Sequence, residues 1–343
     1  MPEKMQAILT HKDGGAEQLY VGEVEVPVPR PGELLVRVKA IGVNRMDILQ
    51  REGRYPLPPG ISPIMGVEFA GVVERVGGDE EDREEEAFPI GSRVFGLVYG
   101  GAYAQYCLLP RSMAMLIPEG MGFTEAAAIP EAWITAYQAL GPLGQLAPHE
   151  RVLIHAGGSG VGVAAIQLAR SPHFQASRVL TTAGSEAKLR VCRELGAHRG
   201  VNYREEEFSK VLEEEGGVDL IVDFIGSSYW QGNLNSLRLD GRLVLLAIMS
   251  GARVPDTDIS PILRKRLRII GSTLRSRSPE YQAELLEGFK RHVLPGLSGG
   301  DDSAAPLRII IDRTYPWHEV RKAHEHMEAN GNIGKIVLVV DEE

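Results

Sequence analysis

The sequence predicts an α/β protein in which a β-rich N-terminal part precedes a doubly wound parallel sheet. Three observations support this prediction. Strand-type segments separated by Pro and Gly fill the first 120 or so residues, and apolar strands alternate with helical segments from about residue 124 onward. A glycine-rich turn joins a short apolar strand to a helix at residues 151–170, as in nucleotide-binding sheets.

Each predicted element follows from local composition and spacing. Five strands are expected in the N-terminal part, at residues 6–9, 34–41, 67–76, 92–95 and 104–109. Five parallel strands are expected in the second part, at residues 152–155, 179–182, 220–224, 243–248 and 267–270. The tail is mixed, with helices expected at 281–292 and 317–329 and strands at 308–311 and 336–340.

The glycine-rich turn has the composition of a phosphate-binding device. Gly157, Ser159 and Gly162 occupy the three positions of the Gly-x-Gly-x-x-Gly fingerprint, so its middle glycine is a serine. The following helix presents unpaired N–H groups and a partial positive charge at its N-terminus. Its residues Val163, Ile166, Gln167 and Arg170 have the spacing of a helix with a buried and an exposed face. We therefore expect a dinucleotide to bind at the residues Gly157, Gly158, Ser159, Gly160 and Val161.

Two other interpretations of this turn exist. It could be a plain strand–helix corner without a ligand, and residues 157–161 come close to the Gly-x-Ser-x-Gly nucleophile elbow of hydrolases, although Val161 replaces its last glycine. The second strand ends about 20 residues after the turn, where a dinucleotide-binding fold contacts the ribose, and this spacing favours the dinucleotide.

The end of that second strand favours NADPH over NADH. An NAD enzyme commonly places a carboxylate there to bind the ribose 2′-hydroxyl, whereas this chain has Ala183, Gly184 and Ser185. Lys188, one turn into the next helix, supplies a positive partner for a 2′-phosphate. Glu186 is expected to interact with the N-terminus of its own helix.

Composition limits the possible functions. The 343 residues suffice for about two domains, and the net charge of −9 argues against a general affinity for nucleic acid. With only two cysteines, neither a disulfide framework nor a four-cysteine zinc lobe is expected. The N-terminus lacks the apolar core of a signal peptide and no apolar run reaches membrane-spanning length, so we expect a cytoplasmic protein.

Several longer strings together resemble a known family. They are residues 44–55, 126–133, 155–162, 182–185, 226–230 and 330–337. With these strings in this order, the chain resembles the zeta-crystallin-like quinone oxidoreductases of the medium-chain dehydrogenase/reductase superfamily over nearly its whole length. Ser159 matches their tumour-suppressor-inducible subgroup, and the acidic run at 79–86 looks like an insertion.

The resemblance implies a GroES-like catalytic domain, residues 1–125 and 278–343, and a Rossmann NADPH-binding domain, residues 126–277, with the active cleft between them. It implies that Gly184, Lys188 and Tyr203 contact the adenosine 2′-phosphate. Tyr55 and Asn44 would be catalytic residues beside the nicotinamide, and Asn332 and Lys335 would reach the cofactor from the tail. Subunits of the family commonly pair through the edge strand of the Rossmann sheet, which implies a homodimer.

No metal is expected in this chain. Zinc-dependent relatives hold the metal with a cysteine near position 44 and a Gly-His-Glu triplet, where this chain has Asn44 and Gly66-Val67-Glu68. His318, His324 and His326 form the only histidine cluster, and their spacing does not place them on one helix face, so we expect surface histidines.

Without a Lewis acid, an electron-poor quinone is the expected hydride acceptor because the negative charge spreads over its conjugated ring. Asn44 and Tyr55 would orient its carbonyl oxygen, and Tyr55 would either donate the proton or only pack against the ring.

Two alternatives remain open at the sequence level. One is reduction of an activated C=C bond in an enone, alkenal or enoyl thioester, for which Arg51 and Arg54 are the only obvious cations for CoA phosphates. The other is a non-catalytic NADPH-binding sensor.

Overall fold

The computed structural model of the chain describes residues 3–55, 57, 60–78, 87–299 and 306–340. Its contacts divide the chain into two compact units, which are described separately below. The first comprises Met1–Glu131, Arg275–Leu286 and Ile309–Glu343, and the second comprises Ala132–Leu274 and Glu287–Arg308. Residues 287–308 thus group with the second unit, whereas the sequence analysis assigned the tail from 278 onward to the first.

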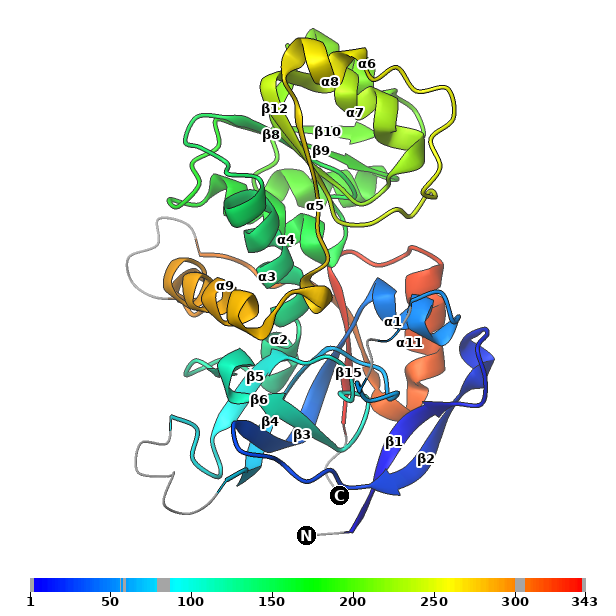
Figure 1. Ribbon diagram of the computed structural model, residues 1–343, viewed down its shortest axis with the longest axis vertical. Helices are drawn as coiled ribbons and strands as arrows, with labels where there is room; N and C mark the ends of the chain where they lie inside the picture. Colours follow the sequence, from blue (N-terminus) through cyan, green and yellow to red (C-terminus); the bar gives the residue numbers. More distant parts are fainter. Residues whose placement is uncertain (1–2, 56, 58–59, 79–86, 300–305, 341–343) are drawn as a thin grey trace. The chain divides into compact units, whose positions relative to one another are not determined.

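The first unit is built mainly on antiparallel strands (Figure 1). A two-stranded ribbon pairs β1 (Lys4–Thr10) with β2 (Leu19–Glu25). The larger sheet has the order β14-β15-β3-β4-β5-β7, and β6 pairs with β3 off this path. Its strands are β3 (Glu33–Val43), β4 (Glu68–Val76), β5 (Arg93–Leu97), β6 (Tyr106–Pro110), β7 (Ala114–Leu116), β14 (Ile311–Pro316) and β15 (Lys335–Val339).

Short helices fill the connections of the first unit. They are η1 (Ala16–Gln18), α1 (Arg45–Arg51), η3 (Arg111–Met113), α2 (Phe123–Ala127), η7 (Trp317–Glu319) and α11 (Val320–Glu328). The start of α1 follows from its sequence: Asn44 is the extended N-cap residue, and the side chain of Asp47, three residues on, accepts the Asn44 backbone N–H. This start carries two of the polar residues of the candidate site described below.

The second unit contains a parallel sheet of order β10-β9-β8-β11-β12-β13. Its strands are β8 (Arg151–Ile154), β9 (Arg178–Ala183), β10 (Arg199–Asn202), β11 (Val218–Asp223), β12 (Leu237–Leu245) and β13 (Arg268–Gly271). In chain order this is 3-2-1-4-5-6, the Rossmann arrangement, whose strand order reverses between β8 and β11. The predicted fold class, a β domain plus a doubly wound parallel sheet, is confirmed.

Helices follow or precede each strand of the parallel sheet. They are η4 (Ala139–Leu143), α4 (Gly160–Arg170), α5 (Glu186–Glu194), α6 (Phe208–Glu214), η5 (Ser227–Tyr229), α7 (Trp230–Ser236), α8 (Ser260–Lys265) and α10 (Leu294–Leu297). Three more helices, α3 (Pro130–Gln138), η6 (Leu274–Ser276) and α9 (Pro279–His292), have residues in both units.

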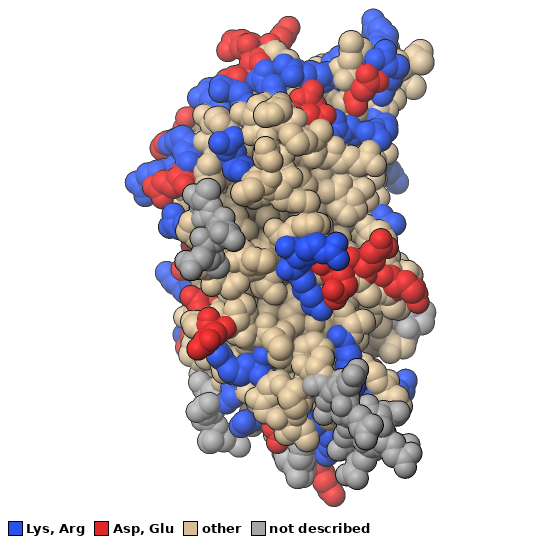
Figure 2. Space-filling view, turned by 90° about the vertical axis from the view of Figure 1, so that its left-hand side faces the viewer, with Lys and Arg blue, Asp and Glu red and all other residues tan. Residues whose placement is uncertain are grey.

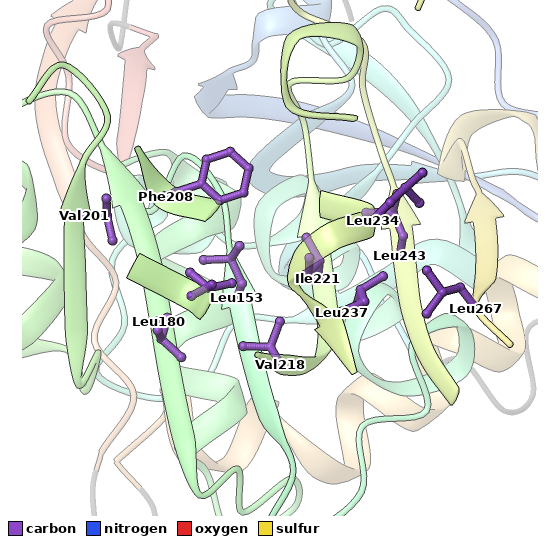
Figure 3. Packing of buried hydrophobic residues seen from close by; sticks show 11 residues of the cluster. Leu153, Leu180, Val201, Phe208, Val218, Ile221, Leu234, Leu237, Leu243 and Leu267 are labelled. Carbon is purple, nitrogen blue, oxygen red and sulfur yellow. The ribbon is translucent and has the colours of Figure 1, made fainter. Parts of the chain in front are cut away.

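The interior of the second unit is apolar on the strands and on the helices that cover them (Figure 3). Leu153, Leu180 and Ile221 come from adjacent central strands and are fully buried. Phe208 at the start of α6 and Leu234 in α7 pack in the same cluster. Central strands of a parallel sheet are buried on both faces, which explains their continuous apolar sequences.

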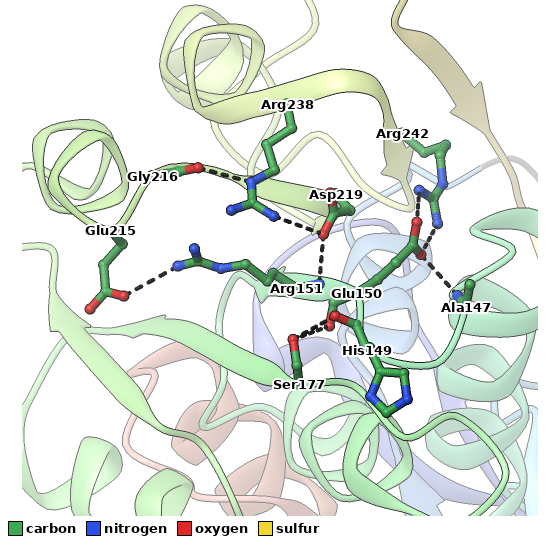
Figure 4. A network of polar contacts seen from close by, with 10 residues as sticks. All are labelled: Ala147, His149, Glu150, Arg151, Ser177, Glu215, Gly216, Asp219, Arg238 and Arg242. Atoms are coloured by element: carbon green, nitrogen blue, oxygen red, sulfur yellow. Dashed lines mark hydrogen bonds and ion pairs between the residues drawn. The ribbon is translucent and has the colours of Figure 1, made fainter.

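Ion pairs and hydrogen bonds of charged side chains connect the strands at the amino end of the parallel sheet (Figure 4). Arg242 on β12, 5% exposed, forms an ion pair with Glu150, which directly precedes β8. The Asp219 carboxylate on β11 accepts the Arg151 backbone N–H at 2.8 Å. These contacts fix the strand ends opposite the glycine-rich turn, which follows the carboxyl end of β8.

The prediction of an amphipathic α4 is wrong, because residues 162–169 are all buried. The Gln167 side-chain amide donates to the Arg308 carbonyl at 3.0 Å, and its oxygen accepts the Arg308 backbone N–H at 2.7 Å. A distant backbone segment therefore contacts this helix at Gln167. Strands β2, β7 and β10 were not predicted, and β14 begins at residue 311, where the predicted strand 308–311 ends.

The surface shows no broad region of one charge sign on the face drawn in Figure 2, where acidic and basic side chains lie in mixed groups between larger uncharged areas. Among the described residues, no helix combines the length and apolarity that crossing a membrane requires.

Candidate active site

The glycine-rich turn begins directly after β8. His155 is buried, Ala156 adopts a left-handed φ of 50°, and α4 starts at Gly160. The Ser159 hydroxyl caps this helix by accepting the Gly162 N–H at 3.0 Å and donating to the Ala156 carbonyl at 2.7 Å. Because a helix leaves its first N–H groups without intrahelical partners, those of Gly160 and Val161 are suited to bind a phosphate.

Two glycines in this turn are required by close packing. A Cβ at Gly157 would lie 2.0 Å from Thr181 Oγ1, and a Cβ at Gly162 would lie 2.4 Å from the Ala156 carbonyl oxygen. Both distances are far below van der Waals contact, so the strand, turn and helix can only approach this closely without side chains there. The serine at the middle position is compatible with this turn because its hydroxyl caps the N-terminus of α4.

The structure brings the predicted 2′-phosphate residues to the ends of neighbouring strands. A Cβ at Gly158 would lie 3.0 Å from Lys188 Cδ, so the Lys188 stem passes over the glycine-rich turn. A Cβ at Gly184 would lie 2.5 Å from the Tyr203 hydroxyl oxygen, so Tyr203 reaches from the end of β10 to the end of β9. Tyr203 remains 47% exposed, so a ligand can reach its side chain.

A buried polar network that the sequence analysis missed lies beneath the same strand ends. His155, after β8, is within 3.0 Å of Thr182 Oγ1 on β9 and 2.8 Å of Asn233 Oδ1 on α7. Asn233 donates in turn to Asp223 at the end of β11. Burial lowers the pKa of His155 to about 4 and raises that of Asp223 to about 6. The network fixes the strand ends on both sides of the point where the strand order reverses.

In the first unit, Asn44, Glu68 and Lys335 form one hydrogen-bonded cluster. The Lys335 ammonium donates to Glu68 Oε1 at 2.6 Å, to Asn44 Oδ1 at 2.7 Å and to the Val43 carbonyl at 2.9 Å. Asn44 Nδ2 donates to Glu68 Oε1 at 2.8 Å. All three ammonium hydrogens of Lys335 therefore have protein partners, and the orientation of the Asn44 amide is set.

Tyr55 lies in the same unit and has a cationic neighbour that the sequence analysis did not find. The Arg275 guanidinium carbon is 5.5 Å from the centroid of the half-buried Tyr55 ring, within cation–π range. Burial raises the pKa of Tyr55, and Arg275 opposes this effect. The buried Arg275 Nε has no hydrogen-bond partner in the described part of the chain. Tyr55 therefore keeps its proton at neutral pH and lies next to a positive charge.

Glu131, near the start of α3, is attached to this cluster through its backbone. Its N–H donates to Glu68 Oε2 at 2.7 Å, so that both Glu68 oxygens are engaged. Burial, reinforced by the charge of Glu68, raises the pKa of Glu131 to about 7.

Two residues considered in the sequence analysis, His324 and Arg51, are buried although they were expected to be accessible. His324 is fully buried, so its prediction as a surface histidine is wrong. Arg51 is 2% exposed and forms an ion pair with Glu328, so it is not available for the phosphates of CoA. Arg54 is exposed at the surface. Asn332 donates to the Gly334 carbonyl at 2.8 Å and so closes the turn before Lys335.

Comparisons with known proteins agree with this arrangement. A family model described as an alcohol dehydrogenase GroES-like domain matches residues 30–119, and one described as a zinc-binding dehydrogenase matches 160–291. The quinone oxidoreductase of Lama guanicoe is 33% identical over 344 residues, covering 98% of each chain. The solved Escherichia coli quinone oxidoreductase in complex with NADPH is 28% identical, with a TM-score of 0.82 and coverage of 97% of this chain and 99% of that one. A mycobacterial protein solved in complex with NADPH is 28% identical, with a TM-score of 0.80 and coverage of 98% and 99%.

The residues of this chain do not fit the zinc ion that one of these family descriptions names. Among the described residues, no three His, Cys, Asp or Glu side chains are grouped so that they could hold a metal. The Glu68 carboxylate already binds the Lys335 ammonium, which places a fixed positive charge there. Positions 44, 66 and 67 carry an amide, no side chain and an apolar side chain, none of which is a zinc ligand of the usual kind.

Proposed function

Because the chain belongs to the quinone oxidoreductase family of the medium-chain dehydrogenase/reductase superfamily, we propose that it reduces quinones with NADPH and without zinc. The observation that carries this proposal is the Asn44–Glu68–Lys335 cluster, in which a lysine ammonium binds the one carboxylate remaining from the zinc-site pattern. A substrate reduced here has to accept hydride without metal assistance. A quinone does so because its conjugated ring spreads the negative charge.

The cofactor site in this proposal lies at the carboxyl ends of β8, β9 and β10. The N–H groups at the start of α4 would bind the pyrophosphate, with Gly157, Gly158, Ser159, Gly160 and Val161 shaping the turn. Lys188 and Tyr203, which lie against Gly158 and Gly184, would bind the 2′-phosphate. NADPH supplies the hydride from its nicotinamide ring when bound. Asn332 and Lys335 would contribute by holding the tail against the Asn44 cluster.

The proposed roles of Tyr55 and Asn44 follow from their environments. Hydride addition converts a quinone to a hydroquinone anion, which requires one proton. Tyr55 is protonated at neutral pH, and donor and acceptor are both phenols, so the proton passes between groups of similar acidity. Arg275 lowers the cost of the negative charge then left on Tyr55. Asn44 Nδ2 donates to Glu68 Oε1 at 2.8 Å and to the Gly42 carbonyl at 3.4 Å, and it would exchange the longer of these bonds for one to the substrate oxygen.

Steady-state NADPH oxidation with a panel of quinones and a matched panel of enones tests this function. Quinone turnover well above enone turnover is expected, and the reverse preference would assign the chain to activated C=C reduction. NADPH binding without turnover of either panel would indicate a non-catalytic sensor. In the Tyr55→Phe variant, an unchanged quinone rate would remove Tyr55 as the acid, whereas a fall with unchanged KM for NADPH supports that role.

We propose further that the protein is a cytoplasmic homodimer. Cys107 and Cys192 are both buried and unpaired, which is compatible with a reducing compartment. In the described part of the chain, β13 pairs with β12 alone, and Ile269 on β13 and Leu263 on α8 are 37% and 83% exposed. An edge strand with apolar neighbours is suited to pair with a second copy.

A further inference from the structure

A chain of buried polar side chains leads to the helix start that carries Asn44. Arg51, at the end of α1, has its NH1 group 3.2 Å from Nδ1 of His324 on α11. Nε2 of His324 is 3.0 Å from the Tyr103 hydroxyl, which donates to Asp47 Oδ2 at 3.3 Å. All four side chains are at most 2% exposed. The hydride and proton transfers proposed above do not involve this series of hydrogen-bonded side chains.

The direction of every hydrogen bond in the chain is fixed at Arg51. A guanidinium can only donate, so Nδ1 of His324 accepts and the ring hydrogen must be on Nε2. Nε2–H then donates to the Tyr103 oxygen, and the Tyr103 hydrogen is directed to Asp47. Burial, assisted by the charge of Arg51, lowers the pKa of His324 to about 3, so the ring is neutral. Burial, followed by the charge of Asp47, raises the pKa of Tyr103 well above its usual value.

Asp47 connects this chain to the candidate site. The same Oδ2 oxygen that receives the Tyr103 hydrogen also accepts the Asn44 backbone N–H at 2.8 Å. Asn44 in turn is bonded to Glu68 and Lys335. Asp47 thus lies between a directed series of donors and the residue proposed to orient the substrate.

We propose that Asp47 is a positioning residue whose carboxylate fixes Asn44, and that Tyr103 and His324 support it in that form by directing a hydrogen bond at Oδ2. Hydrogen bonds to an ionised acceptor are about twice as strong as those to a neutral one. A proton on Oδ2 would oppose the Tyr103 hydrogen, and the chain cannot reverse because Arg51 has no acceptor. Protonation is therefore confined to Oδ1, which is buried and has no hydrogen-bond partner in the described part of the chain, and it weakens both bonds at Oδ2.

The charges around Asp47 set the pH at which this occurs. Burial raises its pKa to about 6, Lys335 on β15 and Arg275 on η6 lower it, and Glu68 on β4 raises it. Glu131 on α3 and Arg51 on α1 are the other charged groups coupled to the cluster. Asp47 is thus ionised at neutral pH and becomes neutral in mildly acidic solution.

Tyr103→Phe tests the proposal, and Tyr315→Phe is its matched control. Tyr315 also bonds a histidine of α11, His326, at 3.1 Å, and neither residue belongs to the series Arg51–His324–Tyr103–Asp47. The Asp47 carboxyl is titrated by NMR in the full-length protein labelled with ¹³C at aspartate side chains, and its signal is identified by its loss in Asp47→Asn. Tyr103→Phe should raise the Asp47 pKa by about one unit. The wild type and Tyr315→Phe should titrate alike, and an unshifted pKa in Tyr103→Phe would overturn the proposal.

His324 variants provide a second test that does not depend on Tyr103→Phe folding. Glutamine can accept from Arg51 and donate to Tyr103, so His324→Gln should retain the wild-type Asp47 pKa, whereas His324→Leu should raise it. Equal pKa values in the two variants would contradict a directed chain.

The kinetic consequence rests on the proposed quinone reductase function. The acidic fall in kcat should follow the Asp47 pKa in each variant. In Asp47→Asn kcat should be about tenfold lower and should lack the part of the fall that follows Asp47. A wild-type kcat in Asp47→Asn would refute the positioning role. If quinones are not reduced at all, the proposed function is wrong. The NMR titrations would still show whether Tyr103 and His324 stabilise the Asp47 carboxylate.

Discussion

The Lys335 ammonium lies 2.6 Å from Glu68 Oε1, and the two side chains are 6% and 0% exposed. Lys335 follows the turn closed by Asn332 and begins β15, whereas Glu68 begins β4. The pair is further hydrogen bonded to Asn44 and to the backbone, so no charge is left unsatisfied. Two distant segments of the chain are thereby held together at the position where a metal would otherwise bind the carboxylate.

Lys335→Met should destabilise the protein strongly, because it leaves the Glu68 carboxylate buried without its cation. Removing one partner of a buried ion pair typically costs about 3–5 kcal/mol. Urea unfolding followed by circular dichroism measures this loss, and Lys4→Met is the control, since Lys4 and Glu23 form an exposed pair worth less than about 1 kcal/mol. Adding Glu68→Gln to Lys335→Met should restore much of the stability. A double variant no more stable than Lys335→Met would show that the charge is not the cause.

Lys188→Ala should weaken NADPH and spare NADH. A charge-assisted hydrogen bond to the 2′-phosphate is worth about 1.5–3 kcal/mol, or roughly ten- to hundredfold in affinity, and NADH has no such group. Fluorescence titration with both cofactors measures the two dissociation constants. Lys210→Ala, which removes an exposed lysine paired with Glu207, should leave both unchanged. Equal losses of affinity for NADPH and NADH in Lys188→Ala would refute the proposal that Lys188 binds the 2′-phosphate.

These two predictions differ in how far the sequence could lead to them. Lys188 was found from its spacing after the glycine-rich turn, because a phosphate site made by consecutive strand ends is local in sequence. The Lys335–Glu68 pair joins residues 267 positions apart, and no local pattern indicates that two such side chains meet. His324 and Arg51 were misjudged for the same reason. Charged and titratable residues are usually exposed, and they are buried only where specific partners are available in the folded structure.

The strands show the same limit. Long apolar runs predicted the central strands correctly, whereas β10 consists of only Arg199–Asn202 and is recognised through its pairing with β9. The contact between Gln167 in α4 and the backbone of Arg308 joins residues 141 positions apart, so the local sequence does not indicate it. The contact between Arg275 and Tyr55 was not predicted because the two residues are far apart in the sequence and Arg275 belongs to no recognisable motif.

Asp47→Asn should leave the protein at least as stable as the wild type at pH 7.5, although it lowers activity. The native pKa of about 6 exceeds the ordinary value of 3.8, so the native state binds more protons than the unfolded state in that interval. The contribution of Asp47 to stability therefore falls as pH rises from about 4 to 6, by roughly 3 kcal/mol in total. Thermal unfolding at several pH values should show this fall in the wild type and a smaller one in Asp47→Asn. A marked destabilisation of the variant at pH 7.5 would mean that the carboxylate is held at no cost.

Ile269→Lys should convert the proposed dimer to monomers. Ile269 lies on the edge strand β13, and Leu263 in the preceding helix adds an exposed apolar side chain, so the pairing of two edges would bury both. A lysine at position 269 places like charges together at that interface and also protects an edge strand from pairing. Light scattering after size exclusion measures the mass, and Ile90→Lys, at a 63% exposed position in the first unit, is the control for a surface isoleucine replaced by a charge. A wild-type monomer, or an Ile269→Lys variant that stays dimeric, would exclude this edge as the interface.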